Sequence, residues 1–286
     1  MNKAHLSKVK LSKVKSSETT LHKTSLNQAT LCKEQIEAFN RCGYLHIPNA
    51  INTALLQYLQ QDSDLLLKQI YQQLKNGTIH PDHAFTCRLF QSYLNRINNF
   101  HLHASPKALA LLGHQLIQDI ANKLCHQEHI VSVDMMIIKN LGDELTIPWH
   151  QDITFNQSKD KIIAVGVYLE PSSLDDAPLT LIRDSQTKVH QNIDQYASQN
   201  QSKQISISAK AGDIIVHNPM LVHGSNPISK QSIRRTIYYE FRSLSHVRDR
   251  WSDNNIRKRQ LLEHQGIKQN QQSWGDFQRA LENFCR

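Results

Sequence analysis

Hydrophobic and polar positions change their spacing partway along the chain. In the first part, apolar side chains recur at helical spacing over 54–75 and 106–126, which predicts two packing helices. An earlier helix is predicted to begin at a Thr30 cap and to stop at Gly43, and a short strand should follow over 44–47. The first part of the chain is therefore expected to be mainly helical.

The second part of the chain consists of short β-type runs separated by turn clusters rich in Asp, Ser, Asn and Pro. A polar helical pattern returns over 252–285. Helices first and many short strands afterwards predict an α+β fold, a double-stranded β-helix or jelly-roll (cupin-like) barrel with helices along one side and an open mouth. The predicted strands cover 130–139, 161–170, 178–182, 205–208, 213–217 and 234–242.

Length and composition fit one large domain. A chain of 286 residues with 39% hydrophobic content can bury a substantial core. We expect a basic, disordered tail over 1–30 and a single domain over 31–286. Within that domain we expect helical support over 31–129, a jelly-roll core over 130–243 and a C-terminal helical segment over 244–286.

The formal net charge of +8 sits mostly in the tail, because the first 33 residues hold seven lysines and one glutamate. A short run of solvated lysines is more typical of a disordered extension than of a binding patch, so no nucleic-acid partner is expected. Five cysteines form no Cys-x-x-Cys pair, which favours reduced thiols. No apolar segment approaches the ~20 residues that span a bilayer, and we expect a soluble, cytoplasmic protein without a membrane partner.

His150 and Asp152 are the first candidate metal ligands. In an extended strand the side chains of residues i and i+2 leave on the same face, so these two can bind one metal while Gln151 points away. The pair follows the predicted strand over 130–139 and precedes the one over 161–170, which suits a ligand pair at a barrel mouth.

A second copy of the His-x-Asp pattern occurs at His80-Pro81-Asp82. It lies among Gly and Pro residues, and no strand-like run is evident beside it, so we interpret it as a solvated turn. The chain holds 16 histidines, and for most of them an exposed or core histidine is the default. His217 is the nearest rival to a ligand role, but Asn218-Pro219 should end its strand.

A third ligand is available downstream at His223. Two imidazoles and one carboxylate on one side of Fe(II) leave neighbouring coordination sites open, as in non-haem iron oxygenases. An organic dicarboxylate bound there would need a cation for its far end, and arginine offers a bidentate fork. Arg234 follows His223, and Thr236 lies on the same strand face as Arg234. Both are predicted to bind that carboxylate.

These motifs resemble the phytanoyl-CoA dioxygenase family of Fe(II)- and 2-oxoglutarate-dependent oxygenases. The resemblance covers most of residues 31–243. The matching segments are Phe39-Asn40-Arg41-Cys42-Gly43-Tyr44-Leu45-His46-Ile47-Pro48, Pro148-Trp149-His150-Gln151-Asp152, Gly212-Asp213-Ile214-Ile215-Val216-His217-Asn218, His223-Gly224-Ser225-Asn226-Pro227 and Arg234-Arg235.

The resemblance implies roles for particular residues. His150, Asp152 and His223 would be the iron ligands, and Arg234 would hold the distal carboxylate of 2-oxoglutarate. Met135 and Lys139, on the strand before the His-x-Asp motif, would also reach this co-substrate. The implied reaction consumes 2-oxoglutarate and O2, releases succinate and CO2, and hydroxylates an unactivated C–H of a small metabolite. Halogenating relatives replace the carboxylate with a small residue, so an intact Asp152 favours hydrogen abstraction leading to hydroxylation.

The substrate itself is not inherited from the resemblance, because the family's usual Pro-Gly-Ser-His turn is replaced here by Arg183-Asp184-Ser185-Gln186. Two alternatives remain open: a jelly-roll binding module without catalysis, and a nucleic-acid-associated protein that uses the lysine tail. The residues flanking the ligands that could line a substrate pocket are Trp149, Thr154 and Phe155, and Arg88 could meet an anionic substrate or form a surface ion pair.

Overall fold

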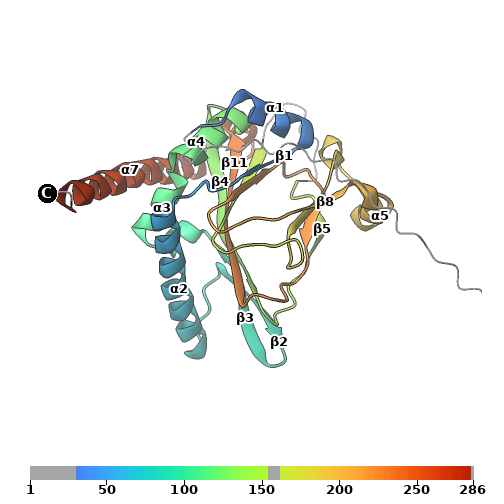
Figure 1. The fold of residues 1–286 in the computed structure, drawn as a ribbon, viewed down its shortest axis with the longest axis horizontal. Coiled ribbons are helices and arrows are strands. Elements are labelled where there is room, and N and C mark those ends of the chain that lie inside the picture. The colour runs from blue at the N-terminus through green and yellow to red at the C-terminus, as the bar shows by residue number, and fades with distance from the viewer. Residues whose placement is uncertain (1–29, 154–161, 285–286) are drawn as a thin grey trace, which may run out of the picture.

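The computed structural model describes residues 30–153 and 162–284 of the chain. The predicted tail lies almost entirely outside the described residues, and so do Thr154 and Phe155. Two antiparallel sheets face each other in the described part (Figure 1). The jelly-roll prediction is confirmed.

The major sheet has the strand order β1-β9-β6-β11-β4-β3-β2, and the minor sheet has the order β5-β10-β7-β8. The longest pairing joins β11 to β4 antiparallel, from Ile233 opposite Asn140 to Ser243 opposite His129. The strands are β1 (Tyr44–Ile47), β2 (His83–Arg88), β3 (Gln91–Asn98), β4 (His129–Asn140), β5 (Ile147–His150), β6 (Ile162–Tyr168), β7 (Leu179–Ile182), β8 (Gln204–Ile207), β9 (Ile214–His217), β10 (His223–Ser225) and β11 (Ile233–Ser243).

Helices cover the outer face of the major sheet, while α5 lies beside the minor sheet (Figure 1). The main hydrophobic core fills the space between these helices and the sheet, with Leu59, Ile70, Val165 and Ile237 all nearly inaccessible to solvent. The helices are α1 (Lys33–Cys42), α2 (Thr53–Lys75), α3 (Pro106–Leu112), α4 (Gln115–Ile120), α5 (Ile193–Gln199), α6 (Leu244–Arg248) and α7 (Asp253–Phe284), with short helical turns η1 (Phe100–Leu102), η2 (Ala121–Cys125), η3 (Ser185–Thr187) and η4 (Gln201–Lys203). None of the described helices is long and apolar enough to cross a membrane.

Alternation along β11 separates the core from the interior of the barrel. Ile237 and Phe241 pack in the hydrophobic core, whereas Arg234, Thr236 and Tyr238 line the cavity between the sheets. Because successive side chains of a strand leave on opposite faces, one strand supplies both the structural core and the polar groups of the cavity.

The region expected to be helical support contains a hairpin, β2–β3, that the sequence did not reveal. Its two-residue turn is Leu89-Phe90, and both residues have positive φ, 48° and 64°. Such tight hairpin turns favour Asn-Gly or Asp-Gly, because these residues adopt positive φ at little cost. A Leu-Phe turn gives no such signal, so the helical support predicted over 31–129 did not include this hairpin.

Two helix predictions also need correction. The first helix is capped by Cys32 and not by Thr30, since the Gln35 side chain accepts the Cys32 N–H and completes a capping box. The predicted helix over 106–126 is divided into α3, α4 and a π-helical turn. Its break at Gly113 coincides with a close helix crossing, where an added Cβ would lie 2.1 Å from the Gly266 carbonyl oxygen of α7.

Candidate active site

His150 is the last residue of β5, and Asp152 follows two residues later. The His150 Nε2 lies 3.2 Å from Asp152 Oδ1, so both side chains point to the same place, as the spacing predicted. Gln151 turns the other way, where its amide nitrogen donates to the backbone oxygens of Lys188 and Met220 and its amide oxygen accepts from His190 N–H. These buried hydrogen bonds fix the backbone between the two candidate ligands.

His223 joins this pair through the minor sheet. It begins β10 and is the register partner of His150 on β5, and its Nε2 lies 3.6 Å from Asp152 Oδ2. One ligand atom from each of the three residues lies within 4.8 Å of the other two. The minor sheet therefore brings together three candidate metal ligands that are far apart in the sequence.

Backbone carbonyls set the tautomer of both imidazoles. The Nδ1–H of His150 donates to the Pro148 oxygen, and the Nδ1–H of His223 donates to the Leu221 oxygen, both at 2.8 Å. Each ring therefore presents the lone pair of its Nε2 to the carboxylate side. Metal-ligating histidines are held in this way, with the second nitrogen bonded to a carbonyl or carboxylate.

The electrostatics keep Asp152 and His223 in forms that can bind a cation, whereas Asp152 raises the pKa of His150 against the effect of burial. Burial alone would raise the pKa of Asp152, but the adjacent imidazoles of His150, His217 and His223 hold it far below its usual range. Burial, reinforced by His217, lowers the pKa of His223 to about 3. At neutral pH Asp152 is thus an anion and His223 a neutral lone-pair donor.

His217 also reaches the site, although β9 ends at this residue as predicted. Its Nε2 lies 3.7 Å from Asp152 Oδ2, and its ring centroid is 4.6 Å from that of His223. Both ring nitrogens are buried and have no hydrogen-bond partner among the described residues. The sequence had identified His217 as a rival ligand; the structure places it beside the three-residue set.

A cavity of about 610 Å³ lies between the sheets and contains the candidate metal ligands in its wall. Arg234 lies in the same wall, where its guanidinium donates to Ser172 Oγ at 2.9 Å and to the Ala177 carbonyl oxygen. Both acceptors are neutral, and no carboxylate of the described residues pairs with Arg234. Its neighbour Arg235 points to the opposite face and forms ion pairs with Glu170 and Asp64.

The other residues predicted from the sequence fall into two groups. Met135 and Thr236 line the cavity. Trp149 is outside it and packs against Ile182, Ala197 and Val222, because it precedes His150 on β5 and leaves on the other face of the strand. Arg88 is also outside the cavity lining, and it forms a surface ion pair with Glu144.

Lys139 lies next to the cavity but is not part of its lining. Its Nζ is fully buried and donates to the backbone oxygens of Leu145, Ser225 and Asn226. Burial and the nearby Arg234 charge lower the pKa of Lys139 to about 7. The ammonium therefore ties β4 to the chain that follows His223.

Sequence reasoning missed two tyrosines in the cavity wall, Tyr168 and Tyr238. Gly166, which pairs with Tyr238 across β6 and β11, leaves room for that ring, because an added Cβ would lie 2.7 Å from Tyr238 Cε1. The period-two spacing of Arg234, Thr236 and Tyr238 was a signal that could have identified Tyr238.

Fold and site together define a jelly-roll protein with two histidines and one carboxylate at the mouth of its barrel. The phytanoyl-CoA dioxygenase (PhyH) family model matches residues 39–236. The chain belongs to this family of Fe(II)- and 2-oxoglutarate-dependent oxygenases.

Solved structures share this fold at low sequence identity. EvdMO1 is 20% identical with a TM-score of 0.64, over 74% of this chain and 50% of that one. The carbocyclase SnoK from nogalamycin biosynthesis, described as non-haem and alpha-ketoglutarate-dependent, is 14% identical with a TM-score of 0.62, over 77% and 87%. EctD from S. alaskensis with bound Fe is 18% identical with a TM-score of 0.61, over 78% and 81%. The chain thus spans half the length of EvdMO1 but more of the other two.

Among curated proteins, no sequence matches this chain significantly.

Proposed function

We propose that this protein binds Fe(II) through His150, Asp152 and His223 and uses 2-oxoglutarate to hydroxylate an unactivated C–H of a small organic molecule. Two imidazole nitrogens and one carboxylate suit ferrous iron and leave sites for a chelating co-substrate and O2. The EctD structure with bound Fe and the alpha-ketoglutarate-dependent SnoK support the same pair of cofactors here. When bound, they would supply the oxidant, with 2-oxoglutarate converted to succinate and CO2.

The observation that carries the co-substrate proposal is the unpaired charge of Arg234. A buried guanidinium that contacts only neutral acceptors is costly unless an anion completes its surroundings. The distal carboxylate of 2-oxoglutarate provides that anion and suits the planar fork of arginine. Thr236, two residues further along β11, would donate its hydroxyl to the same carboxylate.

Met135 and Lys139 take different roles in this proposal. Met135 would pack against the carbon chain of 2-oxoglutarate from the cavity wall. Lys139 is bonded to three backbone oxygens, so it would act by holding the scaffold beneath the site and by adding positive potential beside Arg234.

The cavity indicates the size and polarity of the substrate. Its volume of about 610 Å³ lies within the range of small-molecule sites, ~300–1,000 Å³. Apolar residues such as Phe85, Val133 and Ile147 share its wall with Asn95 and Arg96. This lining fits a small metabolite with an apolar body and polar or anionic groups, and Arg96 replaces Arg88 as the candidate contact for an anion.

A binding module without catalysis is the second candidate function. The same cavity could hold a ligand without any reaction, but a binding site alone does not require imidazoles with preset tautomers around an ionised carboxylate. Cytoplasmic localisation and the absence of a nucleic-acid partner stay predictions.

The test is anaerobic addition of Fe(II) and then 2-oxoglutarate to purified protein, monitored by the weak visible charge-transfer absorption of the iron chelate. Replacing Arg234 with Gln should raise the 2-oxoglutarate concentration for half-saturation roughly 10–100-fold. This fold-change corresponds to the free energy that a charge-assisted hydrogen bond contributes to binding. Arg88→Gln is the matched control and should leave it unchanged, because Arg88 lies outside the cavity. Absence of the absorption in folded, iron-loaded wild-type protein would reject the oxygenase proposal in favour of the binding module.

A further inference from the structure

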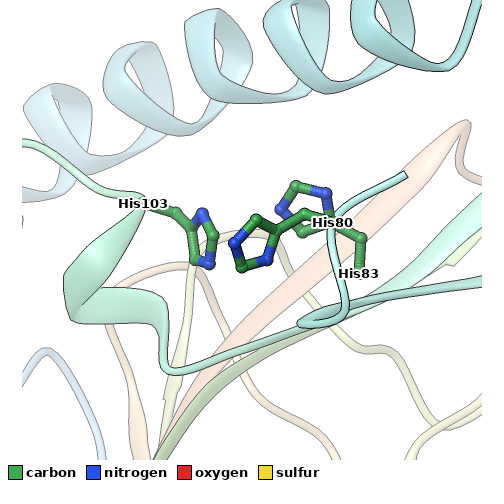
Figure 2. A group of neighbouring side chains, drawn as sticks. All are labelled: His80, His83 and His103. Carbon is green, nitrogen blue, oxygen red and sulfur yellow. The ribbon is translucent and has the colours of Figure 1, made fainter. Parts of the chain in front are cut away.

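A second cluster of imidazoles lies away from the candidate iron ligands, at the base of the β2–β3 hairpin. It consists of His80, His83 and His103, which we call the hairpin histidine cluster (Figure 2). His80 precedes β2, His83 is the first residue of β2, and His103 follows η1 in the turn that leads to α3. The ring centroids are 4.7–5.3 Å apart, and one nitrogen from each ring lies within 4.8 Å of the other two.

Hydrogen bonds engage two of the three rings. His103 Nε2 bonds to Asp82 Oδ2 at 2.9 Å, so Nδ1 is its remaining nitrogen. His80 Nδ1 accepts the Asp82 backbone N–H at 3.1 Å, and a cation bound to His80 would replace this hydrogen bond, because a neutral imidazole has a single lone-pair nitrogen. His83 Nε2 is buried and has no hydrogen-bond partner among the described residues. A buried nitrogen without a partner costs free energy, and a bound cation would remove that cost.

The backbone around the cluster is held in place before any ligand binds. His83 N–H donates to the His80 carbonyl oxygen, and Asn98 N–H donates to that of Asp82, both at 2.9 Å. The Asp82 carboxylate also accepts from the Asn99 side chain at 2.9 Å. Asp82 thus joins the turn before β2 to the turn after β3, and it orients His103 in the way that carboxylates orient metal-bound histidines.

We propose that the hairpin histidine cluster is a second metal site, which binds a Zn²⁺-like divalent cation through His80, His83 and His103 and water. Three neutral imidazoles suit zinc and its neighbours in the transition series, whereas Ca²⁺ and Mg²⁺ require oxygen ligands. Nitrogens ~2.0–2.1 Å from a tetrahedral zinc lie roughly 3.3 Å from one another. Small rotations of the three side chains would therefore close the cluster around the ion, and His80, which is exposed, gives the ion a route from solvent.

The site would have a structural role. β2 and β3 supply Phe85, Thr86, Asn95 and Arg96 to the wall of the cavity. The ion would connect the first residue of β2 to the turn beyond β3, and so would fix the base of the hairpin that forms this wall. This role does not depend on which reaction the cavity supports.

The test separates the two metal sites with tag-free, full-length protein. The first variant, His150→Ala/Asp152→Ala/His223→Ala, removes the candidate iron ligands. It should keep one Zn²⁺, measured by competition with a chromophoric chelator, and Co²⁺ in its place should show the visible absorption of tetrahedral coordination. Adding His80→Gln or His83→Gln should abolish both signals and the rise in melting temperature caused by Zn²⁺. His264→Gln, which alters an exposed histidine on α7, is the matched control and should preserve them.

His80→Gln is also made alone, in protein that keeps the candidate iron ligands. This second test does not depend on the folding of the triple variant His150→Ala/Asp152→Ala/His223→Ala. His80 is exposed, so His80→Gln should fold normally, as circular dichroism would check, and should lower zinc binding from two ions to one. A triple variant that folds normally but binds no Zn²⁺ would overturn the proposal. So would zinc that remains bound after both His80 and His83 are replaced, because the ion would then lie elsewhere.

Discussion

Two segments of this protein carry the same His-x-Asp pattern, and the structure uses them differently. At His150-Gln151-Asp152 the carboxylate faces the histidine two residues before it, with 3.2 Å between Asp152 Oδ1 and His150 Nε2. At His80-Pro81-Asp82 the carboxylate bonds instead to His103 at 2.9 Å. In the roles proposed above, Asp152 is itself a metal ligand, whereas Asp82 orients a ligand, His103.

The cause of this difference is the backbone at each segment. His150 ends a strand, and Gln151 is anchored on the opposite side, so residues i and i+2 share a face. Pro81 lies in a turn, where the alternation of a strand does not hold and Asp82 is directed towards the chain after β3. The comparison teaches that the tripeptide pattern has a metal-binding meaning only together with the local conformation.

The largest expected effect distinguishes the two aspartates. Asp152→Ala should weaken Fe(II) binding by more than ~100-fold, because loss of even an outer-shell partner typically costs 10–100-fold. Asp82→Ala should leave Fe(II) binding unchanged. Anaerobic titration with Fe(II) in the presence of 2-oxoglutarate measures both, and equal losses in the two variants would refute the assignment of different roles.

The stability of the fold around His150-Gln151-Asp152 should depend strongly on Lys139. Lys139→Met removes the donor to three backbone carbonyl oxygens, and we expect it to lower the free energy of unfolding by about 2–4 kcal/mol. Urea denaturation measures this loss, and Lys258→Met, at an exposed lysine on α7, is the control that should cost almost nothing.

Lys139 also predicts a pH dependence. Its pKa of about 7 in the folded protein is below the ordinary value of 10.5, so between these values the unfolded chain binds the additional proton. The cost of burying the cation is fully present below pH 7 and is relieved as the pH rises, by up to about 1.4 kcal/mol per pH unit. Wild-type stability should therefore rise relative to Lys139→Met between pH 7 and 10. A constant difference would show that Lys139 stays protonated.

A smaller effect on stability is expected at the contact between Gly166 and Tyr238 in the cavity wall. Gly166→Ala should cost about 1–3 kcal/mol, since its Cβ would lie 2.7 Å from the ring and would push Tyr238 into the cavity. In a Tyr238→Leu background the same substitution should cost much less, because the crowded ring atom is gone. Additive losses in denaturation experiments would contradict this explanation.

The smallest effect concerns the indirect role of Asp82. In the triple variant that lacks the candidate iron ligands, Asp82→Asn should weaken Zn²⁺ binding about tenfold, the lower end of the usual outer-shell effect. The amide keeps the size of the carboxylate but loses its charge. A loss as complete as that of His83→Gln would mean that Asp82 binds the ion directly.

Much of the fold followed from periodicity, because a strand's alternation and a helix's spacing are local properties. The run from Ile130 to Lys139 predicted β4, and the helical pattern over 54–75 predicted α2. The β2–β3 hairpin was missed because Leu89-Phe90 gives no turn signal. Trp149 was misplaced because it is next to the candidate ligand His150, and by the same alternation its side chain leaves on the opposite face of the strand.

The sequence by itself determined that His150 and Asp152 share a face and that Arg234 and Thr236 share another. In extended chain, side chains two positions apart leave on the same face. The tertiary structure alone decided which distant groups meet them. Sheet pairing brings His223 opposite His150, and the packing of two turns brings His103 to His80 and His83. Such contacts depend on long-range packing of the chain, which no local spacing of residues encodes.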